Sequence, residues 1–180
     1  MTMTEKKARV AINGFGRIGR AFSRAAFGNA NIEIVAVNDL TSPENLAYLL
    51  KYDTVYGRAP FSVEAKGNTL VIDGKSVPVL SEREPSKLPW KDMKVDVVVE
   101  STGKFTSAEK AQAHIDAGAK RVVITAPAKG EGVETILLGA NEEKFGSAGA
   151  ITSNASCTTN ACSPIIGILD EALGIERAIL

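Results

Sequence analysis

The sequence predicts an α/β protein with a doubly wound, mainly parallel β-sheet, and three observations lead to that prediction. Residues 9–37 read as a strand, a glycine-rich turn, a helix and a second strand, which together make a βαβ unit. The second strand, residues 32–37, is apolar at nearly every position, as expected for a strand covered on both faces in a parallel sheet. The alternation of strands and helices returns after residue 95. Helices are therefore expected on both faces of the sheet.

The remaining elements follow from short apolar runs and from residues that start or stop helices. Ser42 as N-cap and Pro43 at the first helical position begin the second helix, and Gly118 ends the third. The expected strands cover residues 9–12, 32–37, 95–100, 121–125, 135–138 and 151–152, and the expected helices cover residues 17–28, 42–52, 107–117 and 156–173.

Two segments depart from this alternation. Residues 61–80 read as short β-like pieces with turns at 66–68 and 73–74, which predicts an inserted hairpin excursion. The chain ends inside a further predicted strand, residues 178–180. Because natural domains usually end at a turn, a helix end or a paired edge, we expect this C-terminus to be a truncation.

Composition excludes several classes of protein. In 180 residues, 44% are hydrophobic and 21 basic residues balance 21 acidic ones, so the chain is expected to be globular and to bind neither nucleic acid nor an anionic membrane. No apolar run is long enough to span a bilayer, and no signal peptide is evident. Two cysteines and one histidine are too few for a structural zinc site or a disulfide framework. We therefore expect a cytoplasmic protein without a metal.

The turn after the first strand has the spacing G-x-G-x-x-G. Gly14 permits a tight turn, Gly16 lets a pyrophosphate approach the backbone, and Gly19 lets the helix pack closely on the sheet. The helix N-terminus adds unpaired N–H groups for the phosphates. Asp39 ends the second strand, where a carboxylate accepts hydrogen bonds from an adenosine ribose and repels a ribose phosphate. The pattern predicts a Rossmann-type domain that binds NAD rather than NADP; the alternative is a glycine-rich turn and a capping Asp in an unrelated α/β protein.

A second motif, residues 153–160, stands where the last helix begins. The positive end of the helix dipole favours the thiolate of Cys157, which makes this thiol a candidate nucleophile. Ser156 and Thr158 flank it with hydroxyl groups, and backbone N–H groups there are suited to stabilising an oxyanion. The alternative is an ordinary capped helix start. Cys162 lies on another side of the helix and is expected to be a buried packing residue.

Six segments in this order resemble the phosphorylating glyceraldehyde-3-phosphate dehydrogenases, from Val10 to the last residue. They are NGFGRIGR, Asn38-Asp39-Leu40, KYDTVYG at 51–57, ESTGKFT at 100–106, TAPAKG at 125–130 and SNASCTTN at 153–160.

The resemblance implies roles for individual residues. Cys157 would be the catalytic nucleophile, and Ser156 and Thr158 would bind the substrate phosphate or inorganic phosphate. The cofactor-binding residues would be Arg17 and Ile18 by their backbone at the pyrophosphate, Asp39 at the adenosine ribose, Arg83 by the adenine, and Thr102, Gly103 and Thr125 along the path to the nicotinamide, beside Gly14, Gly16 and Gly19.

The family's general base is a histidine that by alignment would fall about four residues beyond Leu180. His114 is not expected to replace it, because it lies in the predicted helix 107–117 and reads as a surface residue or a satisfied helix residue.

These observations together predict the N-terminal part of an NAD-dependent enzyme that oxidises and phosphorylates glyceraldehyde 3-phosphate. Residues 1–155 would form the NAD-binding domain, and residues 156–180 would begin a truncated catalytic domain. The partners implied are the sugar phosphate and inorganic phosphate, with a homotetramer for the full-length family. Two alternatives stay open: an NAD-binding fragment without turnover, and a relative that acts on erythrose 4-phosphate.

Overall fold

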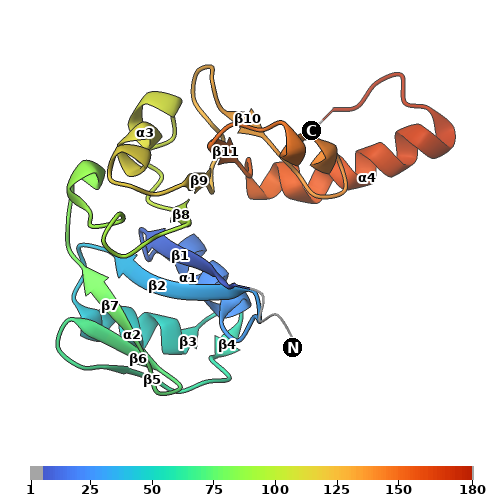
Figure 1. The fold of residues 1–180 in the computed structure, drawn as a ribbon. Coiled ribbons are helices and arrows are strands. Elements are labelled where there is room, and N and C mark those ends of the chain that lie inside the picture. The colour runs from blue at the N-terminus through green and yellow to red at the C-terminus, as the bar shows by residue number, and fades with distance from the viewer. Residues whose placement is uncertain (1–5, 180) are drawn as a thin grey trace, which may run out of the picture.

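A nine-stranded sheet forms the centre of the computed structural model, which describes residues 6–179 (Figure 1). The strand order is β10-β11-β9-β8-β1-β2-β7-β6-β5, and all pairs from β10 to β7 are parallel. The strands are β1 (Ala8–Asn13), β2 (Ile32–Asn38), β5 (Val63–Ala65), β6 (Thr69–Ile72), β7 (Lys75–Leu80), β8 (Val97–Glu100), β9 (Arg121–Ile124), β10 (Glu134–Thr135) and β11 (Ile151–Ser153). This arrangement confirms the predicted α/β fold.

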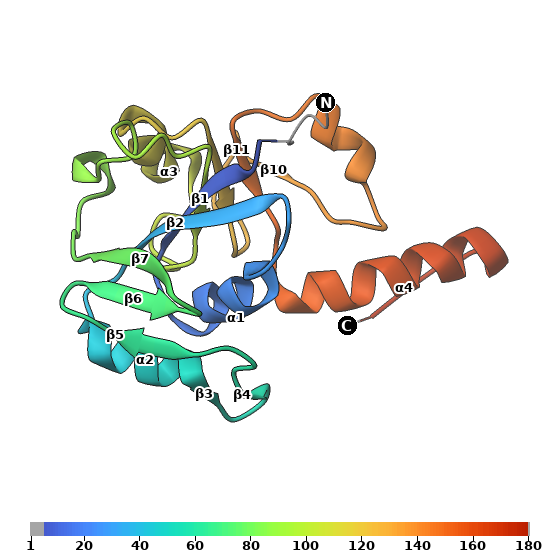
Figure 2. The ribbon, with the colours of Figure 1, turned by 60° about the horizontal axis from the view of Figure 1, so that its bottom comes forward.

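Helices cover both faces of the sheet, as Figure 2 shows for α1 and α2 on one side and α3 on the other. The helices are α1 (Arg17–Ala26), α2 (Pro43–Lys51), α3 (Ala108–Asp116) and α4 (Cys157–Leu173), with short 3-10 turns at Pro85–Lys87 and Glu142–Gly146. Successive strand residues point to opposite faces, so Ile12 joins the cluster under α2 while Ala11 joins the cluster that contains Ala111 of α3.

The three strands β5, β6 and β7 extend the main sheet and are not a separate excursion. β7 pairs in parallel with β2, and β6 and β5 continue antiparallel beyond it. The expected turn at 73–74 is a two-residue connection in which Asp73 and Gly74 both have positive φ, 43° and 77°. A small hairpin that the sequence analysis did not predict, β3 (Tyr52–Asp53) with β4 (Gly57–Arg58), follows α2.

Some element ends differ from the expectation. Val95 does not belong to β8, because its N–H donates to the carbonyl oxygen of Trp90 in a turn at 3.0 Å. Helix α1 ends at Ala26 since Gly28 turns the chain with a φ of 87°. Residues 178–179 form no strand, because they pair with no strand among residues 6–179, and Leu180 of that prediction lies outside the described residues.

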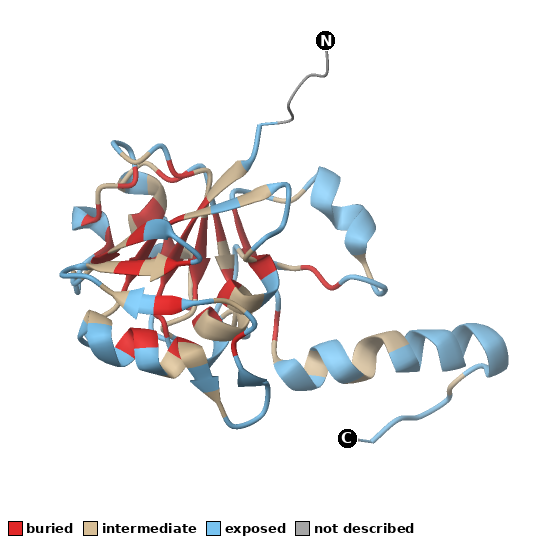
Figure 3. Cartoon of the chain, turned by 90° about the horizontal axis from the view of Figure 1, so that it is seen from below, coloured by how far each residue is buried: buried red, intermediate tan, exposed pale blue. Residues whose placement is uncertain are grey.

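Burial falls off sharply at α4. Figure 3 shows the buried residues gathered in the sheet, while α4 runs out from it and is half-buried or exposed along its length. None of the described helices is both long and apolar enough to cross a membrane.

Candidate functional site

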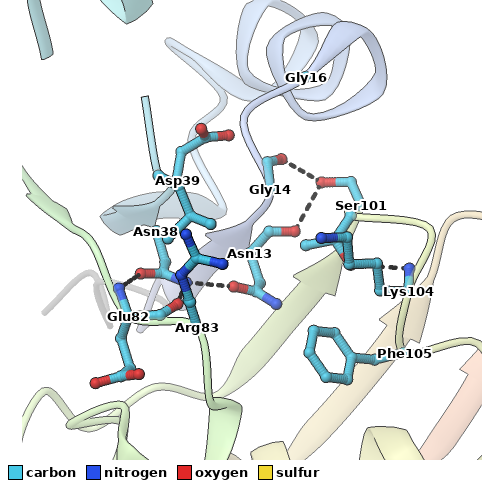
Figure 4. A pocket seen from close by; sticks show the side chains of 12 residues that line it. Asn13, Gly14, Gly16, Asn38, Asp39, Glu82, Arg83, Ser101, Lys104 and Phe105 are labelled. Atoms are coloured by element: carbon cyan, nitrogen blue, oxygen red, sulfur yellow. Dashed lines mark hydrogen bonds between the residues drawn. The ribbon is translucent and has the colours of Figure 1, made fainter. Parts of the chain in front are cut away.

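A cleft of about 310 Å³ opens at the carboxyl ends of β1, β2 and β8 (Figure 4). Crevices of this kind, at the carboxyl edge where the chain turns to opposite sides of a parallel sheet, are where α/β proteins bind dinucleotides. Its lining residues come from the glycine-rich turn, the end of β2, the segment after β7 and the segment after β8: Asn13, Gly14, Gly16, Asn38, Asp39, Leu40, Glu82, Arg83, Ser101, Thr102, Lys104 and Phe105.

The three glycines of the turn have three different geometries. Gly14 has a φ of 91°, and a Cβ added there would lie 2.7 Å from the backbone nitrogen of Thr102. A Cβ at Gly19 would lie 2.2 Å from the carbonyl oxygen of Gly14, so α1 packs on the turn itself. A Cβ at Gly16 would have no protein atom within 4 Å. Gly16 is therefore not needed for packing and leaves open space beside the cleft for a ligand.

Asp39 braces the glycine-rich turn. One carboxylate oxygen accepts the backbone N–H of Phe15 at 2.7 Å, and the other accepts that of Thr41 at 2.9 Å. A carboxylate oxygen can accept a second hydrogen bond, so Asp39 retains the capacity to bind ribose hydroxyl groups. The pattern predicted the ribose role and left a capping Asp as the alternative, and Asp39 does cap backbone N–H groups here.

Charged residues of both signs border the cleft. In Figure 4 Arg83 lies near Asp39 and Asn38, while Lys104 and Phe105 lie across the cleft. The backbone N–H of Glu84 donates to the Glu82 carboxylate at 2.9 Å and lowers the pKa of that carboxyl group. Glu82, Lys104 and Phe105 were not predicted, because they stand in irregular segments whose path over the sheet is not visible in the sequence.

The last residues of three neighbouring strands form a polar row beneath the cleft. Asn38, Asn13 and Glu100 end β2, β1 and β8, and they are register partners across the sheet. All three are at least 96% buried. The row was also missed, although a signal was present: each of these polar residues ends an otherwise apolar strand.

His114 of α3 reaches this row. It is fully buried and contacts Glu100 and Trp90. The expectation of a surface residue is wrong, and the alternative of a satisfied helix residue is confirmed. The buried face of α3 explains the difference, since His114 and Ala111 both pack toward the sheet.

The predicted nucleophile stands at the N-terminus of α4, just after β11. Ser156 caps the helix by accepting the N–H of Thr159 at 3.0 Å, and Cys157 is exposed in the first turn. Ala155 enters the turn with a φ of 56°, an unusual conformation for a residue with a side chain. Cys162 is half-buried, so the expectation of a buried packing residue is wrong; no residue of α4 is buried by the described part of this chain.

The structure brings some of the predicted residues together and leaves others apart. Gly14, Gly16, Asp39, Arg83 and Thr102 line one cleft. The remaining predicted residues do not line that cleft: Arg17 and Ile18 are exposed at the start of α1, Gly19 is buried behind the turn, Gly103 and Thr125 flank the ends of β8 and β9, and Ser156, Cys157 and Thr158 lie at the start of α4.

The cleft fits the expected dinucleotide. Gly16 leaves open space at the N-terminus of α1 where a pyrophosphate would fit, and Asp39 at the end of β2 has acceptor oxygens that would suit a ribose. In residues 6–179 no three His, Cys, Asp or Glu side chains gather where they could hold a metal ion.

Comparisons with known proteins agree with this geometry. A family model described as glyceraldehyde 3-phosphate dehydrogenase, NAD binding domain, matches residues 8–108. The chain is 53% identical to a glyceraldehyde-3-phosphate dehydrogenase of Thermotoga maritima, over 96% of the chain and 52% of the relative. It is 52% identical to one of Geobacillus stearothermophilus, over 96% of the chain and 51% of the relative. The chain thus spans about half the length of the curated relatives it matches.

Proposed function

This chain belongs to the glyceraldehyde-3-phosphate dehydrogenase family and carries its NAD-binding domain, and we propose that the protein oxidises glyceraldehyde 3-phosphate with NAD and inorganic phosphate to 1,3-bisphosphoglycerate. The observation that carries the proposal is the position of Cys157. Its thiol is exposed at the N-terminus of α4, and α4 follows β11 at the same carboxyl edge of the sheet that forms the cleft.

Residues of the cleft would hold the cofactor. The N–H groups at the start of α1 follow Gly16 directly and would suit the pyrophosphate, and Asp39 would suit the adenosine ribose. Both Arg83 and Thr102 line the cleft; Arg83 would contact the adenine, and Thr102 the nicotinamide half on the β8 side. When bound, NAD supplies the acceptor for a hydride.

The chemistry at Cys157 has two stages. The thiolate adds to the aldehyde carbon, a C–S bond forms as the C=O π bond breaks, and the oxygen takes up a proton to give a thiohemiacetal. Loss of a hydride from carbon and of the hydroxyl proton to a base leaves a thioester. An oxygen of inorganic phosphate then attacks the thioester carbonyl, the C–S bond breaks, and the products are an acyl phosphate and the free thiolate.

The start of α4 supports those steps. An α-helix leaves its first N–H groups without partners inside the helix, and Ser156 caps that of Thr159. The N–H groups of Cys157 and Thr158 are thereby suited to stabilise the oxyanion or a phosphate. Thr158 adds an exposed hydroxyl group beside the thiol.

The base that takes the hydroxyl proton is not His114. That ring is the single histidine of the chain, and it is fully buried with both nitrogens engaged. We therefore expect the 180-residue chain alone to bind NAD with little or no turnover. We also propose that the domain boundary lies near residue 155, because residues of β11 are buried in the sheet whereas α4 has no buried residue.

The test combines binding and turnover on one purified sample. NAD binding is titrated through the fluorescence of Trp90, the single tryptophan, and NADH formation is followed at 340 nm with glyceraldehyde 3-phosphate and phosphate. Binding without turnover by the chain, and turnover by the protein that contains it, supports the proposal; loss of that turnover in Cys157→Ser identifies the nucleophile. Absence of NAD binding would refute the cofactor site.

Replacing glyceraldehyde 3-phosphate by erythrose 4-phosphate in the same assay shows which of the two substrates is oxidised faster. The relatives reported above are all named glyceraldehyde-3-phosphate dehydrogenase, which favours glyceraldehyde 3-phosphate. Faster turnover of erythrose 4-phosphate would overturn that preference.

A further inference from the structure

A chain of buried hydrogen bonds runs beneath the NAD cleft from β2 to α3. The Nδ2 of Asn38 donates to the Oδ1 of Asn13 at 2.7 Å, and the Nδ2 of Asn13 donates to Glu100 Oε2 at 2.6 Å. His114 Nε2 lies 3.0 Å from the same oxygen, and the indole N–H of Trp90 donates to His114 Nδ1 at 3.0 Å. None of these side chains has been assigned a role in binding or chemistry above.

The contact with Trp90 determines the protonation of His114. An indole N–H is a donor only, so the Nδ1 atom that receives it carries no proton. His114 is therefore a neutral ring with its proton on Nε2, which donates to Glu100. The Nε2 of His114 and the Nδ2 of Asn13 lie 3.4 Å apart because both donate to one oxygen.

The partners of Glu100 can all donate hydrogen bonds to its two carboxyl oxygens. Oε2 accepts from Asn13 and His114. Oε1 accepts the backbone N–H of Thr102 at 2.8 Å and the Thr102 hydroxyl group, whose oxygen in turn accepts the N–H of Lys104 at 3.0 Å. Each of these partners can act as a donor, a pattern that suits a carboxylate, and none of them is a charged group.

We propose that Glu100 is a positioning residue for the NAD cleft, with His114 held as the neutral Nε2–H form by Trp90. One buried carboxylate holds Thr102, on the β8 side of the cleft, and Asn13 on the β1 side. Through Asn13 it also aligns Asn38, whose side chain holds the backbone of Glu82 by accepting its N–H at 2.9 Å. The inference rests on the NAD site proposed above and explains what holds the β8 side and the β1 side of that cleft in place.

The variant Glu100→Gln tests the positioning role. Glutamine keeps the shape of the side chain but has one acceptor oxygen and one NH2 group. In either orientation the NH2 group faces hydrogen-bond donors, those of Thr102 in one and those of Asn13 and His114 in the other. We expect NAD to bind about tenfold more weakly, measured by calorimetry. The control is Ala111→Gly, which loosens the same buried face of α3 without removing a hydrogen bond of this chain.

The outcomes separate positioning from general loosening. A loss of affinity at least fivefold larger in Glu100→Gln than in Ala111→Gly supports the proposal, and any smaller difference overturns it. If the unsubstituted chain does not bind NAD, the proposed cofactor site is refuted. If the unsubstituted chain binds NAD and the two variants bind it equally well, only the positioning role of Glu100 is refuted.

Nitrogen NMR of His114 tests the hydrogen-bond assignment without any variant. The chain has one histidine, so its two ring nitrogens give unambiguous signals. A protonated Nε2 and a bare Nδ1 support the network, and Trp90→Phe should then move the Nδ1 signal. A ring protonated on both nitrogens, or on Nδ1 alone, would overturn the proposal even if Glu100→Gln does not fold.

Discussion

Replacing Gly19 or Gly16 by alanine separates the folding role of the glycine-rich turn from its binding role. A Cβ at Gly19 would lie 2.2 Å from the Gly14 carbonyl oxygen and 3.0 Å from Ser101 Oγ. The first of these distances is more than 1 Å short of ordinary contact, which begins at 3.4 Å, and because the Gly14 oxygen is backbone, it cannot rotate away. Helix α1 or the turn must therefore move.

The expected cost follows from two opposing effects. Overpacking against rigid atoms lowers the unfolding free energy by about 2–3 kcal/mol, and the higher helix propensity of alanine raises it by about 1 kcal/mol. Gly19→Ala should therefore lose about 1–2 kcal/mol of unfolding free energy and lower Tm by roughly 2–8 °C. In Gly16→Ala the added Cβ meets no protein atom within 4 Å, and a φ of −71° suits alanine, so stability should change by less than about 0.5 kcal/mol.

Binding should reverse the order of the two variants. The Cβ of Gly16→Ala fills the space beside the cleft, so we expect its Kd for NAD to rise at least about tenfold although its fold is intact. Urea unfolding followed by circular dichroism measures stability, and calorimetry measures NAD binding. An unchanged stability of Gly19→Ala would refute the close approach of α1 to the turn. Wild-type affinity in Gly16→Ala would refute the pyrophosphate position.

Three further predictions address the thiol of Cys157, the carboxylate of Asp39 and the ion pair of Asp96 with Lys120. Cys157 should react with iodoacetamide about tenfold faster than Cys162, because it is exposed at a helix N-terminus and Cys162 is half-buried; peptide mapping that finds equal rates would contradict this. Asp39→Ala should weaken NAD binding about tenfold and narrow the preference for NAD over NADP, and an unchanged NAD affinity would remove Asp39 from the site. The hydrogen bonds from Lys120 Nζ and the Arg9 N–H lower the folded-state pKa of Asp96. The ionised carboxylate therefore stabilises the fold fully above its unfolded pKa of about 3.9, and this stabilisation is lost as the pH falls through the folded-state pKa. Asp96→Asn should therefore cost about 1 kcal/mol at pH 7, a difference that shrinks below about pH 4; an equal difference at both pH values would exclude this titration.

The sequence predicted the elements whose residues carry a local signal. The alternation of apolar strands with capped helices along the chain indicated the α/β fold. The spacing of Gly14, Gly16 and Gly19, together with Asp39, indicated where a dinucleotide would bind. Five of the predicted cofactor residues line the cleft because parallel strands all end at the same edge, which makes the residues after each strand neighbours. The predicted start of the last helix near Ser156 likewise placed Cys157 at the start of α4, where the structure has Ser156 as the N-cap.

Long-range packing decided the rest. A hairpin pattern at residues 61–80 says nothing about which strand it will join, and only the sheet showed that β7 pairs with β2. His114 has the same local sequence whether α3 turns it outward or inward, and burial against Trp90 and Glu100 is a property of the assembled core. The polar row under the cleft is of the same kind, because Asn38, Asn13 and Glu100 are far apart in the chain and become neighbours only when β2, β1 and β8 align in register.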